Sequence, residues 1–138
     1  MEEIEDKKTI IERKKDNLDV NMMNPLVWAY IGDSVYEVFI RMKLVNETKL
    51  NPHKLHIETI KYVKAKAQAE TLTKIYDFLT DEEKDIVRRG RNADAHHLPK
   101  NAELADYKHA TALEALIGYL YLTKQDERLQ EILNYCIN

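Results

Sequence analysis

Apolar residues recur every three or four positions along most of the chain, which is the spacing of one face of an α-helix. Asn24 is typical of a helix N-cap, and Pro25 is typical of the first helical position, where its missing N–H is not needed. The pattern predicts a long helix from Pro25 to about Lys43. The residues expected to share one face of it are Leu26, Tyr30, Asp33 and Glu37.

The rest of the chain shows similar start and stop signals. Asn51 and Pro52 repeat the same helix start, and residues 52–79 predict two helices with a break near residues 62–66. Thr80 and Glu83 have the spacing of a capping box, so a short helix is expected to follow and to end with Gly90 as its C′ residue. A loop is expected over residues 91–101. The last two helices are predicted over about 102–122 and 125–137.

Composition supports an all-α fold in one domain. The chain has 138 residues with only three glycines and three prolines, and alternating β-branched runs are scarce. No apolar run approaches the ~18 residues of a membrane span, and the acidic start is unlike a signal peptide. Residues 1–20 are expected to form a charged arm or helix, and residues 21–138 the domain itself.

The distribution of charge is more informative than its sum. A net charge of -3 does not by itself predict a nucleic-acid-binding protein. Basic residues nevertheless cluster in two places, which suits contacts with phosphate groups but also suits an ordinary solvated helix face or a helix C-terminus. The candidate contacts are Lys64, Lys66, Arg88, Arg89, Arg91 and Asn92.

Two carboxylates stand in apolar segments, where an unpaired charge is unfavourable. Asp33 follows a glycine within NPLVWAYIGDSVYE, and Glu114 lies within ATALEALIGYLYL. Two such acids on two helices indicate a site for a hard cation. Each acid alone could instead cap a helix or form a salt bridge. Glu37, one turn after Asp33, is either a further oxygen ligand or an ordinary solvated acid.

Other sequence features point to no additional chemistry. His96 and His97 have no partner at zinc-ligand spacing, so they are expected to be surface residues. No phosphate-binding glycine loop, dinucleotide fingerprint or Ser-His-Asp order is present. Cys136 is the single cysteine, which excludes an intrachain disulfide and is compatible with a reducing cytoplasm.

Several segments resemble the ribonuclease III family in their order and content. Residues 30–35, YIGDSV, resemble the signature helix of that family, and residues 113–122, LEALIGYLYL, resemble its second conserved helix. The likeness is greatest to the Mini-ribonuclease III branch, in which the nuclease domain stands alone. Its hallmarks are matched by residues 24–26, 63–69, 88–93 and 99–101, so that the resemblance covers about residues 22–135.

The resemblance implies a homodimer of helical ribonuclease III domains that cleaves double-stranded RNA with Mg²⁺. Asp33 and Glu114 fall on the catalytic and metal-binding acids of the family. The implied substrate is the precursor of large-subunit (23S) ribosomal RNA, with a ribosomal protein as a further partner on it. Without a double-stranded RNA-binding domain, the dimer itself is expected to grip the duplex through the two basic clusters.

Two departures from the family pattern keep an alternative open. Ala29 and Thr111 stand where ribonuclease III proper has acids, so one well-held Mg²⁺ is more plausible than two held by protein alone. The same departures suit a catalytically inactive RNA-binding module of this fold. A helical protein–protein adaptor with structural acids is the second alternative.

Overall fold

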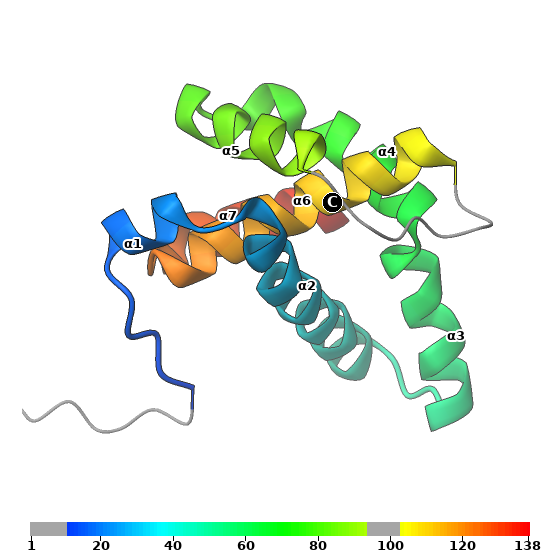
Figure 1. Cartoon of the computed structure of the whole chain (residues 1–138). Helices are drawn as coiled ribbons and strands as arrows, with labels where there is room; N and C mark the ends of the chain where they lie inside the picture. The colour runs from blue at the N-terminus through cyan, green and yellow to red at the C-terminus, as the bar shows by residue number, and fades with distance from the viewer. Residues whose placement is uncertain (1–10, 94–102) are drawn as a thin grey trace, which may run out of the picture.

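The computed structural model describes residues 11–93 and 103–138, and the described residues form helices with no strand. The all-α prediction is therefore confirmed for this part of the chain (Figure 1). The elements are α1 Asn17–Met22, α2 Pro25–Glu47, α3 Pro52–Val63, α4 Ala65–Ile75, the 3₁₀ turn η1 Tyr76–Phe78, α5 Asp81–Asn92, α6 Leu104–Leu122 and α7 Asp126–Ile137.

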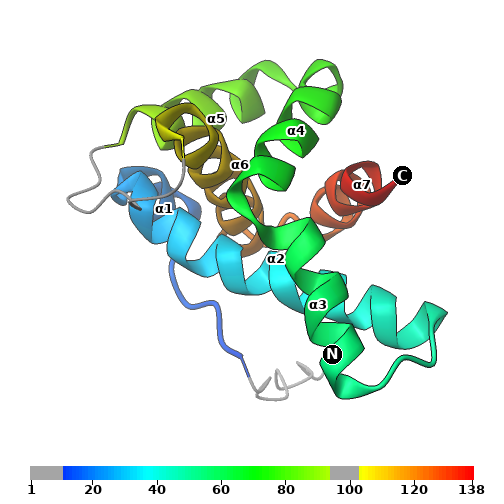
Figure 2. The same ribbon diagram turned by 90° about the vertical axis from the view of Figure 1, so that its right-hand side faces the viewer.

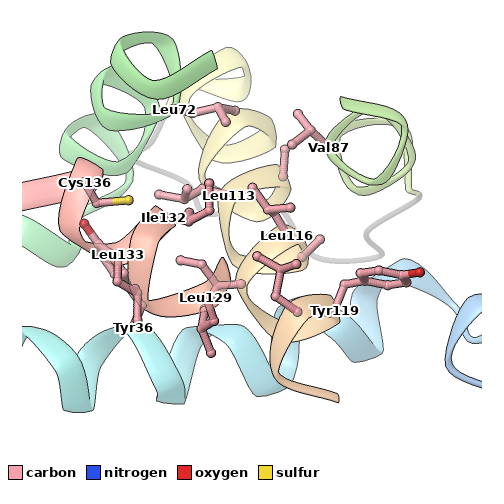
Figure 3. Packing of buried hydrophobic residues seen from close by; sticks show 14 of the residues in the cluster. Tyr36, Leu72, Val87, Leu113, Leu116, Tyr119, Leu129, Ile132, Leu133 and Cys136 are labelled. Carbon is pink, nitrogen blue, oxygen red and sulfur yellow. The ribbon is translucent and has the colours of Figure 1, made fainter. Parts of the chain in front are cut away.

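Helix α6 is the centre of the fold. It packs against α2, α4, α5 and α7, and its sequence from Ala110 to Leu120 is buried at every position except Glu114 (Figures 1 and 2). Figure 3 shows side chains of the surrounding helices gathering around Leu113 and Leu116. A helix that is apolar on all sides must be covered on all sides, which explains why α6 lies inside the helical assembly.

The predicted helix starts are confirmed by their hydrogen bonds. The Asn24 side chain accepts from the backbone N–H of Leu26 at 3.0 Å, and Asn51 accepts from that of Lys54 at 2.9 Å. Each cap satisfies one of the N–H groups that a helix start leaves unpaired. The predicted break between two helices is also confirmed, since Lys64 separates α3 from α4 with extended backbone angles.

The capping box before α5 is present in full. The Thr80 hydroxyl accepts from the Glu83 backbone N–H at 3.1 Å, and the Glu83 side chain accepts from the Thr80 N–H at 2.9 Å. The predicted end of this helix is wrong. Helix α5 continues to Asn92, and Gly90 is a buried helical residue with no positive φ.

Gly90 serves packing rather than helix termination. A Cβ atom on it would lie 2.7 Å from the Ala115 Cβ and 3.2 Å from the Ala112 Cα, so its absence lets α5 lie close against α6. Two other boundaries also differ from expectation: α2 extends one turn further, to Glu47, and Arg91 and Asn92 belong to α5 rather than to a loop. Residues 94–101 of the predicted loop, with His96 and His97, lie outside the described residues.

The segment before α2 is attached to the rest of the chain. Val20 is fully buried, and its carbonyl oxygen accepts from the Trp28 indole N–H at 2.8 Å. Further upstream, Arg13 forms a two-pronged ion pair with Asp126 at 2.6 and 3.1 Å and lies over the Tyr121 ring. The division of the chain near residue 20 stays a prediction, and residues 1–10 lie outside the described part. None of the described helices is long and apolar enough to cross a bilayer.

Candidate active site

Two glycines bring the backbones of α2 and α6 into direct contact. A Cβ atom on Gly32 would lie 1.7 Å from the Glu114 carbonyl oxygen, and one on Gly118 would lie 1.8 Å from the Trp28 carbonyl oxygen. No side chain larger than hydrogen fits at either position without moving a backbone. This close crossing brings the residue after Gly32, which is Asp33, next to the turn of α6 that carries Glu114.

The carboxyl groups of Asp33 and Glu114 form a pair across this crossing. They lie within hydrogen-bonding reach of each other. Burial is the main cause that raises the pKa of Glu114 to about 8, and the negative charge of Asp33 and the hydrogen bond to it add to the effect. Among the ion pairs that the described residues form, none includes either acid. The juxtaposition expected from sequence is therefore present.

The environments of the two acids differ from the expectation that both are buried. Asp33 is exposed, and only Glu114 is substantially buried. The buried positions of α2 recur at every fourth residue through Trp28, Gly32, Tyr36 and later positions, and Asp33 lies one residue away from that stripe. Asp33 is thus presented at the rim of the α2–α6 contact rather than inside it.

Gln68 completes this site and was missed by sequence reasoning. Its side chain on α4 is only 1% exposed and contacts Glu114 through a hydrogen bond that partly offsets the rise in the Glu114 pKa. Its Nε2 donates to the Val63 carbonyl oxygen at 3.0 Å, whereas its Oε1 is buried without a hydrogen-bond partner. A signal was available: with Leu72 and Ile75, Gln68 occupies the buried face of α4 at helical spacing.

This donor set fits a hard divalent cation. The site offers two neighbouring carboxyl groups and the buried, unpartnered Oε1 of Gln68. All of them are oxygen ligands of the kind that Mg²⁺ prefers. Within the described ranges no group of three or more His, Cys, Asp or Glu residues has metal-binding geometry. A cation held by Asp33 and Glu114 would therefore keep several water ligands, as Mg²⁺ commonly does.

The nearby positions singled out in the sequence add little to this oxygen set. Glu37 forms an ion pair with Arg41 at 3.0 Å, in keeping with the simpler reading of it as a solvated acid. Ala29 is buried, and the buried Thr111 donates its hydroxyl hydrogen to the Tyr107 carbonyl oxygen at 2.9 Å.

The arginines at the end of α5 are not equivalent. Arg89 donates to the Asn21 carbonyl oxygen at 2.9 Å, and its guanidinium lies 4.7 Å from the centroid of the Trp28 ring. Arg88 is exposed and pairs with Asp85 on the same helix. Arg91 is exposed and contacts only the neighbouring Asn92 side chain, at 3.4 Å, among the contacts of the described residues. Arg89 is thus bound to the fold, whereas Arg88 and Arg91 face solvent.

The lysines of the other basic cluster lie at the α3–α4 junction. Lys64 is the residue between the two helices and Lys66 lies in the first turn of α4, and both are exposed. Lys61 pairs with Glu58 at 2.8 Å. Gln68 belongs to the same first turns of α4, so this cluster is close in sequence to a residue that contacts Glu114.

Comparisons with known proteins identify the family of this chain. Residues 26–125 match the Ribonuclease III domain family. The chain is 53% identical over 115 residues to a Mini-ribonuclease 3 of a Thermoanaerobacter species, covering 83% of this chain and 81% of that protein. It is 43% identical to the Staphylococcus aureus Mini-ribonuclease 3, covering 92% and 96% of the two chains.

A solved structure agrees with this likeness. The crystal structure of a Fusobacterium nucleatum protein superposes with a TM-score of 0.75 at 34% identity, covering 86% of this chain and 95% of that one. The region that matches the Ribonuclease III domain family, residues 26–125, includes Asp33 and Glu114. The chain therefore belongs to the ribonuclease III family, within its Mini-ribonuclease 3 group, and is an enzyme of the ribonuclease III type.

Proposed function

We propose that the chain is a Mg²⁺-dependent endonuclease for double-stranded RNA and that Asp33 and Glu114 are its catalytic metal ligands. The observation that carries this proposal is the contact between two carboxyl groups from α2 and α6, of which Glu114 is largely buried and has its pKa raised to about 8. An arrangement of like charges is unfavourable by itself and becomes favourable when a cation binds between them.

The two acids have different roles in this proposal. The largely buried Glu114 would hold the cation from the inner side of the α2–α6 contact, and the exposed Asp33 would hold it from the solvent side. When bound there, Mg²⁺ supplies Lewis-acid polarisation of the phosphate and a water of lowered pKa as nucleophile. Gly32 keeps the two helices close enough for both carboxylates to act on one ion.

We propose that the RNA backbone is bound by exposed basic residues of α5 and of the α3–α4 junction. Lys64 and Lys66 at the start of α4 and Arg88 and Arg91 on α5 are solvent-facing, and Asn92 follows them as a neutral donor. Duplex RNA is recognised mainly through phosphates and 2′-hydroxyl groups across its shallow minor groove, which suits such donors. The binding constant should fall steeply as salt rises, because each neutralised phosphate releases counterions.

A second copy of the chain is the proposed partner for the apolar face of α2 and α3. Val38 is 61%, Met42 51% and Val45 56% exposed, and Ile57 and Ile60 on α3 add to the same set of exposed apolar side chains. Covering such a face excludes water from apolar area, and a homodimer would present two acid pairs to one duplex, one for each strand. Replacing Met42 with Lys should yield monomers in light scattering.

Leu18 offers a matched control for that experiment. It is 73% exposed on α1, which lies away from α3 in both views (Figures 1 and 2). Leu18→Lys should leave the dimer intact. A wild-type chain that is monomeric at all tested concentrations, or a dimer unaffected by Met42→Lys, would contradict the proposed interface.

The physiological substrate we propose is a stem in the precursor of large-subunit (23S) ribosomal RNA, cut in the cytoplasm with a ribosomal protein bound to that RNA. The support for this step is the Mini-ribonuclease 3 resemblance. The test is incubation of the purified chain with a long RNA duplex, with Mg²⁺ and then with EDTA, followed by the precursor stem. Cleavage only with Mg²⁺ is expected.

The same incubation distinguishes the alternatives. Binding of the duplex without cleavage would favour an inactive RNA-binding module of this fold, which the replacement of family acids by Ala29 and Thr111 keeps in view. Neither binding nor cleavage would favour a helical adaptor with structural acids.

A further inference from the structure

Gln68 is the one buried side chain among the described residues that has an unpartnered side-chain oxygen or nitrogen. It is 1% exposed and lies at the end of the first turn of α4, on the face that packs against α6. A buried polar atom without a partner is destabilising, and proteins seldom keep one without a reason. The position of Gln68 beside Glu114 suggests that the reason lies in the acid pair.

The orientation of the Gln68 amide follows from its hydrogen bond. Nε2 donates to the Val63 carbonyl oxygen at 3.0 Å, and a flipped amide would bring Oε1 against that carbonyl, oxygen to oxygen. The unpartnered atom is therefore Oε1, which accepts hydrogen bonds but has none to donate. What it lacks is a donor.

The same side chain also contacts Glu114. Its amide N–H donates to that carboxyl group and so helps to fix where the Glu114 oxygens lie. Gln68 is thus fixed at one end to the α3–α4 junction through Val63 and acts at the other on the more buried of the two acids. A hydrated cation would bring water O–H donors into this neighbourhood.

We propose that Gln68 is a positioning residue for the cation site: its amide holds the Glu114 carboxylate for metal binding, and its free carbonyl oxygen accepts a hydrogen bond from a water of the hydrated ion. This inference rests on the proposed function of Asp33 and Glu114. Groups that orient metal ligands in this way commonly change metal affinity or activity by 10- to 100-fold when removed.

The test is Gln68→Met, which keeps the length of the side chain and removes both amide atoms. Mg²⁺ affinity, measured by calorimetry without RNA, is expected to fall by at least about 10-fold, and kcat for duplex cleavage is expected to fall with it. The dissociation constant of the RNA duplex in EDTA should stay unchanged, because the Gln68 side chain is only 1% exposed and offers no surface to a duplex. Wild-type Mg²⁺ affinity in a folded Gln68→Met variant would overturn the inference.

Thr59→Val is the matched control. Thr59 is 4% exposed and donates its hydroxyl hydrogen to the Leu55 carbonyl oxygen at 2.8 Å on α3, so it tests the loss of a buried polar group outside the site. This variant is expected to bind Mg²⁺ as the wild type does. An equal loss of affinity in Thr59→Val would mean that general destabilisation, not positioning, explains the effect, and would also overturn the inference.

A measurement on the wild-type protein decides the matter if Gln68→Met does not fold. The side-chain amide resonance of Gln68 is expected to shift on titration with Mg²⁺ and to stay in place in the same titration of Glu114→Gln. If the wild type saturates with Mg²⁺ and the Gln68 resonance does not move, the positioning role of Gln68 is refuted and the proposed function of Asp33 and Glu114 is not. A wild-type chain that binds no Mg²⁺ would instead refute the proposed function on which the inference rests.

Discussion

Two largely buried glutamates show opposite solutions to the same physical problem. Glu83 on α5 accepts from the Arg128 Nε and Nη2 groups, both at 2.8 Å, and also caps its own helix. Burial alone would raise the pKa of Glu83, but the hydrogen bonds from Arg128 and from the Thr80 backbone outweigh it and lower that pKa. Glu114 on α6 has a second acid, Asp33, as its neighbour, and its pKa is raised to about 8.

The difference between them separates the needs of the fold from those of the reaction. A buried charge that serves stability is neutralised within the protein, as Arg128 neutralises Glu83. Glu114 forms no ion pair among the described residues and has the acid Asp33 beside it, so we infer that its compensating charge is a bound cation. The contrast predicts that the two residues respond differently to the same substitution.

Among the substitutions considered, Asp33→Asn should have the greatest effect, which is a loss of RNA cleavage. Loss of this carboxylate should lower kcat by at least about 1,000-fold, because metal polarisation contributes several kcal/mol to the reaction barrier. Affinity for duplex RNA, measured in EDTA, should be unchanged or higher, since one charge that repels phosphate is removed. Glu37→Gln is the control: it lies one turn away, pairs with Arg41 and should retain activity. Near-normal turnover in Asp33→Asn would show that the acid pair is not catalytic.

A direct comparison of stability uses the same change at both glutamates. Glu83→Gln should lower the free energy of unfolding by about 2 kcal/mol, since charge-assisted hydrogen bonds from Arg128 are lost. Glu114→Gln should leave the metal-free stability within about 0.5 kcal/mol of wild type near neutral pH, because a carboxyl group whose pKa is raised to about 8 is already mostly neutral there and the amide has the same shape. Denaturant unfolding in EDTA provides both values. Equal losses of stability in the two variants would mean that Glu83 and Glu114 do not differ in their contribution to the fold.

The pH dependence of stability sharpens the assignment of Glu83. Its pKa is lower in the folded state, so its stabilisation is fully present above the unfolded pKa near 4.5 and is lost as pH falls through the lowered folded value. The stability difference between wild type and Glu83→Gln should therefore be constant near neutral pH and shrink below about pH 4.5. A difference that does not change with acidification would mean that Arg128 does not stabilise the ionised form.

A smaller effect distinguishes the arginines of α5. Arg91→Ala should weaken duplex binding by a few-fold without loss of stability. The slope of log K against log salt concentration should become shallower by about 1, the contribution of one phosphate contact. Arg89→Ala should instead lower the melting temperature, because it removes the hydrogen bond to Asn21 and the contact with the Trp28 ring. The opposite assignment of the two effects would contradict the roles inferred from exposure.

The sequence was sufficient for the elements whose causes are local. Asn24, Asn51 and the Thr80–Glu83 box set helix starts through bonds within a few residues, and the apolar surroundings of Asp33 and Glu114 marked both acids. It was insufficient where the cause lies in another helix. Gly90 resembled a helix terminator because the α6 surface that requires its missing side chain was not visible in the sequence.

The same limit explains what was missed around the site. Arg89 was grouped with its neighbours because nothing nearby in sequence reveals that its guanidinium lies over Trp28. Gln68 had a local signal, a polar residue on the apolar face of α4, but its meaning depends on Glu114, 46 positions later in the chain. The roles of Arg89 and Gln68 follow from their contacts with other helices, which the sequence alone does not reveal.

The dependence of stability on Mg²⁺ shows whether Asp33 and Glu114 hold the cation. With Mg²⁺ at about 100 times its dissociation constant, binding to the folded state should raise the free energy of unfolding by about 2.7 kcal/mol in the wild type. The double variant Asp33→Asn, Glu114→Gln should show no such rise, while Glu83→Gln, measured against its own lower baseline, should show all of it. Equal stabilisation of the double variant by Mg²⁺ would place the ion elsewhere and contradict this account.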